Sequence, residues 1–109
     1  MIHETPNAVM RTLAAPSLGA AELSVWEVTM RAGQRGPEHV ADREQVWFVL
    51  DGTLEVDGTP VAAGEARTIP AGAPRQVAAP EDARALVASP AAPSVTTPDG
   101  GTRPLPWAA

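Results

Sequence analysis

The residues with the clearest chemical potential lie just before the most apolar stretch of the chain. A histidine, His39, opens the segment HVADREQVWFVLDG (residues 39–52). The carboxylates near it in sequence are Glu38, Asp42 and Glu44. Because imidazole titrates near neutral pH and also ligates metals, His39 is a candidate general acid or base, or a candidate metal ligand. The alternatives are a structural histidine at a loop-to-strand corner and, for the charged cluster, a solvated loop with local ion pairs.

The stretch after His39 has the alternation of a β-strand. Because successive side chains of a strand point to opposite faces, Gln45, Trp47 and Val49 share one face. A second indole, Trp26, lies in another apolar segment. Either tryptophan could stack on a ligand, but in a chain with one phenylalanine and no tyrosine it is more often part of the core.

The elements that must position these side chains are short β-strands. Twelve prolines and nine glycines interrupt the chain and leave little space for a helix of ordinary length. Residues 22–30 are rich in β-branched and aromatic types, and residues 46–50 predict an apolar strand covered on both faces. Asp51-Gly52 and Asp57-Gly58 predict two hairpins with type I′ turns. The remaining predicted strands end at Ile69 or span residues 75–78 and 84–88.

Many short strands at near-regular spacing predict an all-β domain, either a sandwich or a barrel. A chain of 109 residues has room for one core, which we expect within residues 22–88. Residues 1–21 are expected to form an N-terminal strand or arm. Residues 89–109 hold five prolines, and we expect this tail to pack on the barrel because an exposed Trp107 would gain nothing in a disordered segment.

Composition narrows the classes of partner and compartment. The formal net charge is −5 and the arginines are scattered, which argues against binding to a nucleic-acid backbone. There is no cysteine, so disulfides and thiolate metal sites are excluded. Residues 1–4 carry an acid and no apolar leader, and no apolar run approaches the roughly 18 residues of a membrane helix. We therefore expect a cytoplasmic protein without nucleic-acid or membrane partners.

Two sequence motifs resemble those of the cupin family, small β-barrels of the jelly-roll or double-stranded β-helix type. The first cupin motif, G-x5-H-x-H-x3,4-E-x6-G, can be anchored on Gly52 with His39 as its first histidine. The second, G-x5-P-x-G-x2-H-x3-N, aligns without a gap on Gly64, Pro70 and Gly72. The resemblance spans roughly residues 22–88 and implies a cupin-type jelly-roll β-barrel.

The positions that bind a divalent metal in cupins are largely replaced here. They correspond to His39, Ala41, Gln45 and Arg75. Alanine offers no donor, an amide oxygen is a weak ligand, and arginine repels a cation. A lone histidine cannot hold a metal against water, so we expect neither a metal nor another cofactor. His3 is the one residue that could still swing in to complete an atypical site.

The same resemblance implies that the side chains at these four positions point toward the barrel interior. They would line a pocket there in place of a metal site. Such a pocket suits a ligand with an aromatic or apolar body and an acidic or carbonyl group for Arg75, although an internal carboxylate is an alternative partner for that arginine. The expected catalytic residues are His39 and Arg75, and the expected ligand-binding residues are Gln45, Trp47, Trp26, Val49 and Val77.

The leading functional hypothesis is a metal-independent cupin that binds a small organic molecule and catalyses proton transfer: isomerisation, epimerisation, dehydration or cyclisation. His39 would act as acid or base while Arg75 and Gln45 hold or polarise an oxygen. The alternatives are a non-catalytic binding or sensing module and a metal-dependent enzyme with an atypical ligand set, since one fold hosts many activities. The composition, rich in alanine, proline and arginine, resembles that of proteins from high-GC bacteria. In such genomes single-domain cupins often lie near enzymes of secondary metabolism, which is an association only.

The outward face of the strand at 46–50 carries Val46, Phe48 and Leu50, which need cover. Small cupins commonly dimerise through such faces or by exchanging N-terminal strands. By this analogy we expect a homodimer, in which residues 8–13 could be the covering strand.

Overall fold

The computed structural model describes all residues, 1–109, as thirteen β-strands and two short 3₁₀ helices. No helix is long and apolar enough to cross a membrane. The helices are η1 (Pro16–Leu18) and η2 (Pro106–Ala108). The strands are β1 (Ile2–Glu4), β2 (Val9–Ala14), β3 (Leu23–Met30), β4 (His39–Ala41), β5 (Gln45–Asp51), β6 (Thr53–Val56), β7 (Thr59–Ala62), β8 (Ala66–Ile69), β9 (Pro74–Arg75), β10 (Val77–Ala78), β11 (Ala83–Pro90), β12 (Ser94–Thr96) and β13 (Thr102–Pro104).

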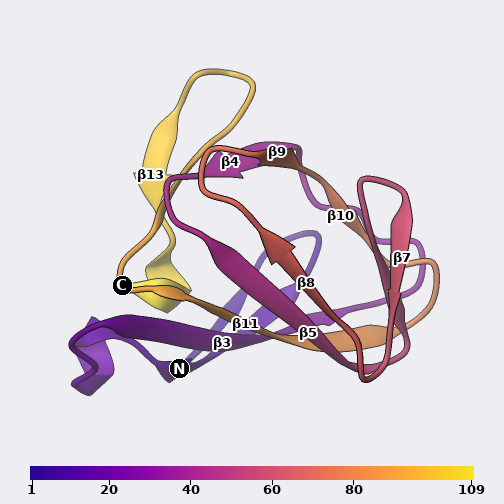
Figure 1. The fold of residues 1–109 in the computed structure, drawn as a ribbon, viewed down its shortest axis with the longest axis horizontal. Helices are drawn as coiled ribbons and strands as arrows, with labels where there is room; N and C mark the ends of the chain where they lie inside the picture. The colour runs from indigo at the N-terminus through magenta and orange to yellow at the C-terminus, as the bar shows by residue number, and fades with distance from the viewer.

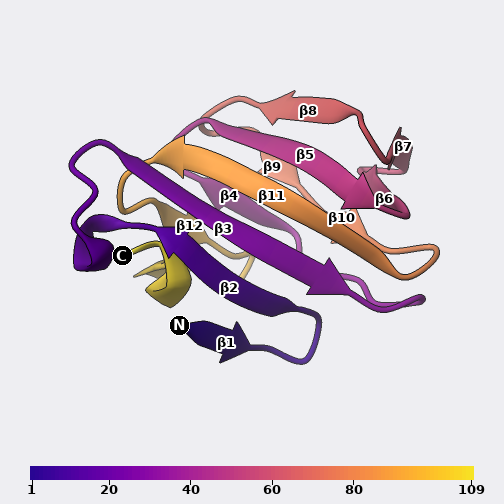
Figure 2. The ribbon, with the colours of Figure 1, turned by 90° about the horizontal axis from the view of Figure 1, so that it is seen from below.

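The strands form three antiparallel sheets that enclose one interior. The largest has the order β1-β2-β3-β11-β5-β8, and its broad face is seen in Figure 2. The two smaller sheets have the orders β10-β6-β7 and β13-β12-β4-β9, and they lie across the interior from the large sheet (Figure 1). This arrangement confirms the all-β fold class expected from the sequence.

Alternation of side chains along β3 and β11 builds the core of the large sheet. Every second residue of each strand is buried, among them Trp26 and Val28 on β3 and Ala85 and Val87 on β11. The two strands pair over eight residues, with Trp26 opposite Val87. Because burial of a valine side chain contributes about 1.5–3 kcal/mol, the shared inward face explains why these are the longest paired strands.

One of the two expected hairpins is confirmed and the other is wrong. At Asp57-Gly58 both residues have positive φ angles, 51° and 81°, and β6 pairs with β7, as a type I′ turn requires. At Asp51-Gly52 only Gly52 has a positive φ, and β5 and β6 belong to different sheets. A Cβ on Gly52 would lie 2.1 Å from the carbonyl oxygen of Asp82, so glycine is needed here because the chain bends closely past another loop.

The outward face of β5 is not covered by the chain itself. Phe48 is 39% exposed, while Val46 and Leu50 are half-buried. Residues 8–13 do not cover this face within the protomer, because β2 pairs edge to edge with β3 and extends the same sheet. The sheet therefore presents an apolar outer surface. The expectation that this segment covers the face in a homodimer stays a prediction.

The C-terminal segment packs against β2 and β3. The hydroxyl of Thr12 donates to the Trp107 carbonyl oxygen at 2.7 Å, and the hydroxyl of Ser24 donates to the Ala108 carbonyl oxygen at 2.7 Å. The Ser24 side chain is fully buried, so this hydrogen bond satisfies a hydroxyl that has no access to water. These contacts fix η2 against one end of the barrel.

Candidate functional site

A cavity of about 400 Å³ lies inside the barrel, between the large sheet and the C-terminal segment. All three tryptophans of the chain, Trp26, Trp47 and Trp107, line it. Its remaining apolar wall includes Met10, Val28, Met30, Val77, Val95 and Leu105. A cavity of this size with aromatic walls and few polar groups is typical of sites for small organic ligands.

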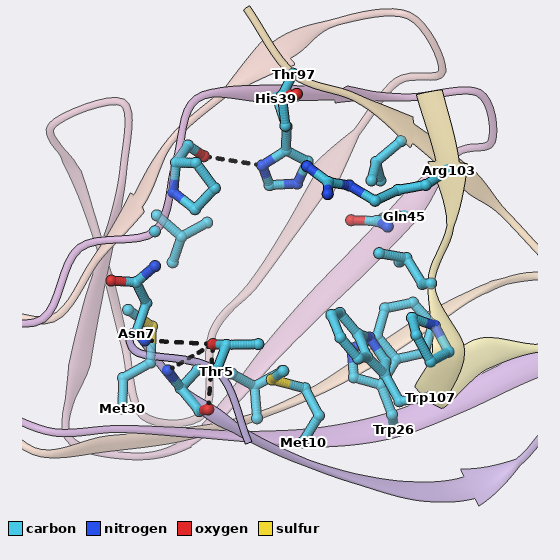
Figure 3. A pocket seen from close by; sticks show the side chains of 18 of the residues that line it. Thr5, Asn7, Met10, Trp26, Met30, His39, Gln45, Thr97, Arg103 and Trp107 are labelled. Atoms are coloured by element: carbon cyan, nitrogen blue, oxygen red, sulfur yellow. Dashed lines mark hydrogen bonds between the residues drawn. The ribbon is translucent and has the colours of Figure 1, made fainter. Parts of the chain in front are cut away.

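The polar groups of the cavity come from strands whose alternation turns them inward. Gln45 and Trp47 lie two residues apart on β5, and His39 begins β4. Figure 3 shows His39, Gln45 and Arg103 on one side of the cavity, with Trp26, Trp107 and Met10 toward the opposite side. We call the side with His39, Gln45 and Arg103 the polar side; Thr5 and Asn7 also line the cavity, near Met10 and Met30 in this view.

The amide of Gln45 is held in one orientation. Its Oε1 accepts hydrogen bonds from Trp47 Nε1 and from Arg75 Nη1, each at 3.1 Å. The side chain is only 2% exposed, and its Nε2 makes no hydrogen bond within the protein. Two donors fix the oxygen, and the amide nitrogen keeps its N–H groups without a partner in the protein, in a residue that lines the cavity.

Arg75 lies behind the cavity rather than in it. It is fully buried, and besides Gln45 its guanidinium donates to the carbonyl oxygens of Ala73 and Pro70, both at 3.2 Å. Burial lowers the pKa of the Arg75 guanidinium, and the negative charge of Asp57 opposes this shift. The expected ligand contact by Arg75 is thus corrected: the residue does not line the cavity, and its three hydrogen bonds within the protein include the one that positions Gln45.

His39 lines the cavity and is held by the backbone on one side of its ring. Its Nδ1 lies 3.0 Å from the carbonyl oxygen of Pro37. Since a carbonyl oxygen can only accept, Nδ1 carries the hydrogen, and Nε2 of the neutral ring bears the lone pair. Burial lowers the pKa of His39, the Pro37 hydrogen bond opposes that effect, and the charge of Arg75 lowers the pKa further. His39 is therefore placed as a neutral proton acceptor.

The other expected site residues divide between the cavity wall and the core. Trp26, Trp47 and Val77 line the cavity. Val49 does not, because its 1% exposed side chain packs in the core below. Sequence reasoning missed Arg103, which lies in a proline-rich segment without periodicity, and it placed Trp107 on the barrel without assigning it to the site.

The donor set does not fit a cupin-type metal ion. Ala41 is fully buried without a donor atom, and both lone pairs of Gln45 Oε1 accept hydrogen bonds. No group of three or more histidine, cysteine or acidic side chains converges anywhere in the structure. His3 packs against Trp107, with ring centroids 6.1 Å apart, and does not complete such a group.

Residues 26–89 match the family described as "Cupin domain", which is more than half of the chain. The chain belongs to the cupin family. No curated protein matches the sequence. This cupin is similar to the polyketide cyclase RemF from Streptomyces resistomycificus, with 25% identity and a TM-score of 0.72 over 92% of this chain and 72% of that one.

Two further solved structures show the same fold. An acetylacetone dioxygenase from Acinetobacter johnsonii has 15% identity and a TM-score of 0.78, covering 98% of this cupin and 80% of that chain. Salicylate 1,2-dioxygenase from Pseudoaminobacter salicylatoxidans has 18% identity and a TM-score of 0.67, covering 78% and 25%. These neighbours confirm the jelly-roll barrel expected from the two motifs.

Proposed function

We propose that this cupin binds a small carbonyl-containing organic molecule in its cavity and catalyses proton transfer on it without a metal ion. The observation that carries the proposal is the combination of a neutral His39 and an oriented Gln45 amide in the wall of one cavity. The first can accept a proton, and the second can donate a hydrogen bond to the oxygen where negative charge develops.

The proposed reaction begins with a ligand whose carbonyl oxygen accepts a hydrogen bond from Gln45 Nε2. His39 Nε2 then takes a proton from the carbon next to the carbonyl, and the electron pair of the broken C–H bond moves onto the oxygen as an enolate. The buried charge of Arg75 behind the amide stabilises that enolate through Gln45. Return of the proton to a different face or atom gives epimerisation or isomerisation. Attack of the enolate carbon on a second carbonyl of the same molecule instead closes a ring, and the alkoxide that forms takes the proton back from His39.

The resemblance to a polyketide cyclase supports cyclisation among these outcomes. The apolar walls also support a second candidate, a non-catalytic binding or sensing module. In that case the hydrogen bond between His39 and the Pro37 carbonyl would only stabilise the loop that leads into β4.

Deuterium exchange separates these two candidates. An aryl β-diketone, which has acidic C–H bonds and a flat apolar body, is incubated in D₂O with wild-type protein or with His39→Asn. We expect wild-type protein to accelerate exchange at the carbon between the carbonyls, and His39→Asn to lose this effect while binding the diketone with unchanged affinity by calorimetry. Binding without accelerated exchange by wild-type protein would favour the binding module, and unchanged exchange with His39→Asn would exclude His39 as the base.

Metal content tests the alternative of an atypical metal enzyme. Untagged protein purified without chelator is expected to hold far less than one equivalent of zinc, iron, manganese or nickel by elemental analysis. Because the proposed acid-base step uses only side chains, the exchange rate is expected to be unchanged after treatment with a chelator. A stoichiometric metal whose removal abolishes exchange would support the metal-dependent enzyme instead.

A further inference from the structure

Arg103 is the one arginine that lines the cavity, and no acidic side chain of the protein forms an ion pair with it. It lies on β13, and its guanidinium takes part in no hydrogen bond or ion pair within the chain. No aspartate or glutamate lines the cavity. The charge of Arg103 contributes to lowering the pKa of Asp99, but no ion pair joins the two side chains, and Asp99 Oδ1 accepts hydrogen bonds from Thr97 Oγ1 and the Gly101 amide. The guanidinium is therefore available to a ligand.

The position of Arg103 matches the polarity of the cavity. Figure 3 shows its side chain extending from β13 over the polar side, where His39 and Gln45 also lie, with Trp26 and Trp107 toward the other side. A positive charge with no acidic neighbour in the wall contrasts with the net charge of −5 of the whole chain. An anionic group is thus favoured in the cavity, although most of the molecular surface would repel it.

The segment that carries Arg103 is anchored on both sides. β13 pairs with β12, and η2 immediately after it is held by the Thr12 and Ser24 hydroxyls. A guanidinium on an anchored strand loses less freedom on binding than one on a mobile tail. Its planar fork can form two parallel hydrogen bonds with a carboxylate, which gives orientation as well as affinity.

We propose that the ligand of this cupin is a flat, largely apolar organic acid whose carboxylate is bound by Arg103 while its ring system lies among the three tryptophans. This inference rests on the proposed function, since it concerns the same cavity and names the class of molecule that enters it. Arg103 then supplies the anion-binding role that the sequence had assigned to Arg75. It acts as a specificity-determining residue, and the proton transfer itself stays with His39 and Gln45.

The test compares two probes of nearly equal shape, 2-naphthoate and its neutral amide 2-naphthamide, by isothermal titration calorimetry. Wild-type protein is expected to bind the acid about tenfold more tightly than the amide, as one charge-assisted pair at a partly exposed rim would give. This preference is expected to shrink at high salt, because an exposed arginine is screened. Arg103→Ala is expected to bind the two probes within about threefold of each other.

The matched control is Arg43→Ala, which removes one positive charge from an exposed loop outside the cavity. It is expected to keep the preference for the acid. Equal binding of both probes by wild-type protein, or a preference that survives in Arg103→Ala, would overturn the carboxylate anchor while leaving the proposed function standing. Binding of neither probe would overturn the organic-acid ligand, and the diketone exchange assay would then decide the proposed function separately.

Discussion

The pair formed by Gln45 and Arg75 shows what the sequence can and cannot predict at the scale of single residues. Alternation on β5 correctly indicates that Gln45 and Trp47 share a face. It cannot indicate that Arg75, thirty residues later, donates to the Gln45 oxygen at 3.1 Å, since that depends on how β9 is placed against β4. Sequence analysis missed Arg103 for the same reason, because its position at the cavity depends on contacts between segments that lie far apart in sequence.

Replacing Arg75 by alanine should destabilise the fold as well as loosen the site. The substitution removes the guanidinium donors of the Ala73 and Pro70 carbonyl oxygens and of Gln45 Oε1, and it opens a void behind Gln45. We expect a loss of about 2–4 kcal/mol in the free energy of unfolding, measured with urea. Arg43→Ala serves as the control and should stay within error of wild type. A similarly small change for Arg75→Ala would show that Arg75 does not support Gln45.

The protonation of His39 should depend on pH in a defined direction. Burial lowers the pKa of His39 below the ordinary value of 6.5; the hydrogen bond to the Pro37 carbonyl opposes this shift, and the charge of Arg75 adds to it. The positive charge of Arg103 also lies on this side of the cavity. The folded state then favours the neutral ring, so this contribution to stability is present above pH 6.5 and is lost as the pH falls through the folded pKa. We expect an NMR titration midpoint for His39 below 6.5. A midpoint above 6.5 would contradict its placement as a neutral base.

At the scale of elements, a turn dipeptide predicts a hairpin correctly when the two strands that pair are also adjacent in sequence. Asp57-Gly58 forms its hairpin because β6 and β7 face each other across two residues. Asp51-Gly52 has the same dipeptide, but β5 already pairs with β8 and β11 in the large sheet, so the chain bends there into another sheet. Turn chemistry alone cannot decide between these outcomes, because the competing strands lie far away in sequence.

Alanine substitutions at Gly52 and Gly58 should distinguish the cost of a positive φ angle alone from the cost of a positive φ angle combined with a steric clash. Gly58 has a φ of 81° and no atom within 4 Å of an added Cβ, so Gly58→Ala should cost about 1 kcal/mol. Gly52 has a φ of 71° and the Asp82 oxygen 2.1 Å from that Cβ, so Gly52→Ala should cost about 3 kcal/mol or more. Urea unfolding of the two variants measures the difference. Equal costs would mean that the loop at Asp82 moves aside freely.

At the scale of the whole molecule, the two faces of the large sheet differ in what covers them. The inner face is closed by the smaller sheets and the C-terminal segment, whereas Figure 2 shows the outer face without another layer. That face carries the ion pairs of Glu27 with Arg11 and Arg84, and beside them an apolar surface. The sequence predicted this apolar outer face from Val46, Phe48 and Leu50.

We propose that a second copy of the chain covers this apolar surface. Leu23 is 56% exposed and Phe48 39% exposed, with Val46, Leu50 and Leu86 half-buried around them. Packing the same surface of two protomers around a two-fold axis would remove these side chains from water and form a closed dimer. Light scattering after gel filtration is expected to give twice the chain mass of 11.3 kDa.

A charge placed at the centre of that surface should separate the protomers. Phe48→Asp would bring two carboxylates into an apolar contact, so we expect a monomer that keeps the β-sheet circular dichroism spectrum of the wild type. Thr59→Asp adds the same charge on the exposed side of β7, in another sheet, and should remain a dimer. A monomeric wild-type protein, or a Phe48→Asp dimer, would show that the outer face is not the interface. Retention of naphthoate binding by monomeric Phe48→Asp would show further that each barrel binds its ligand independently.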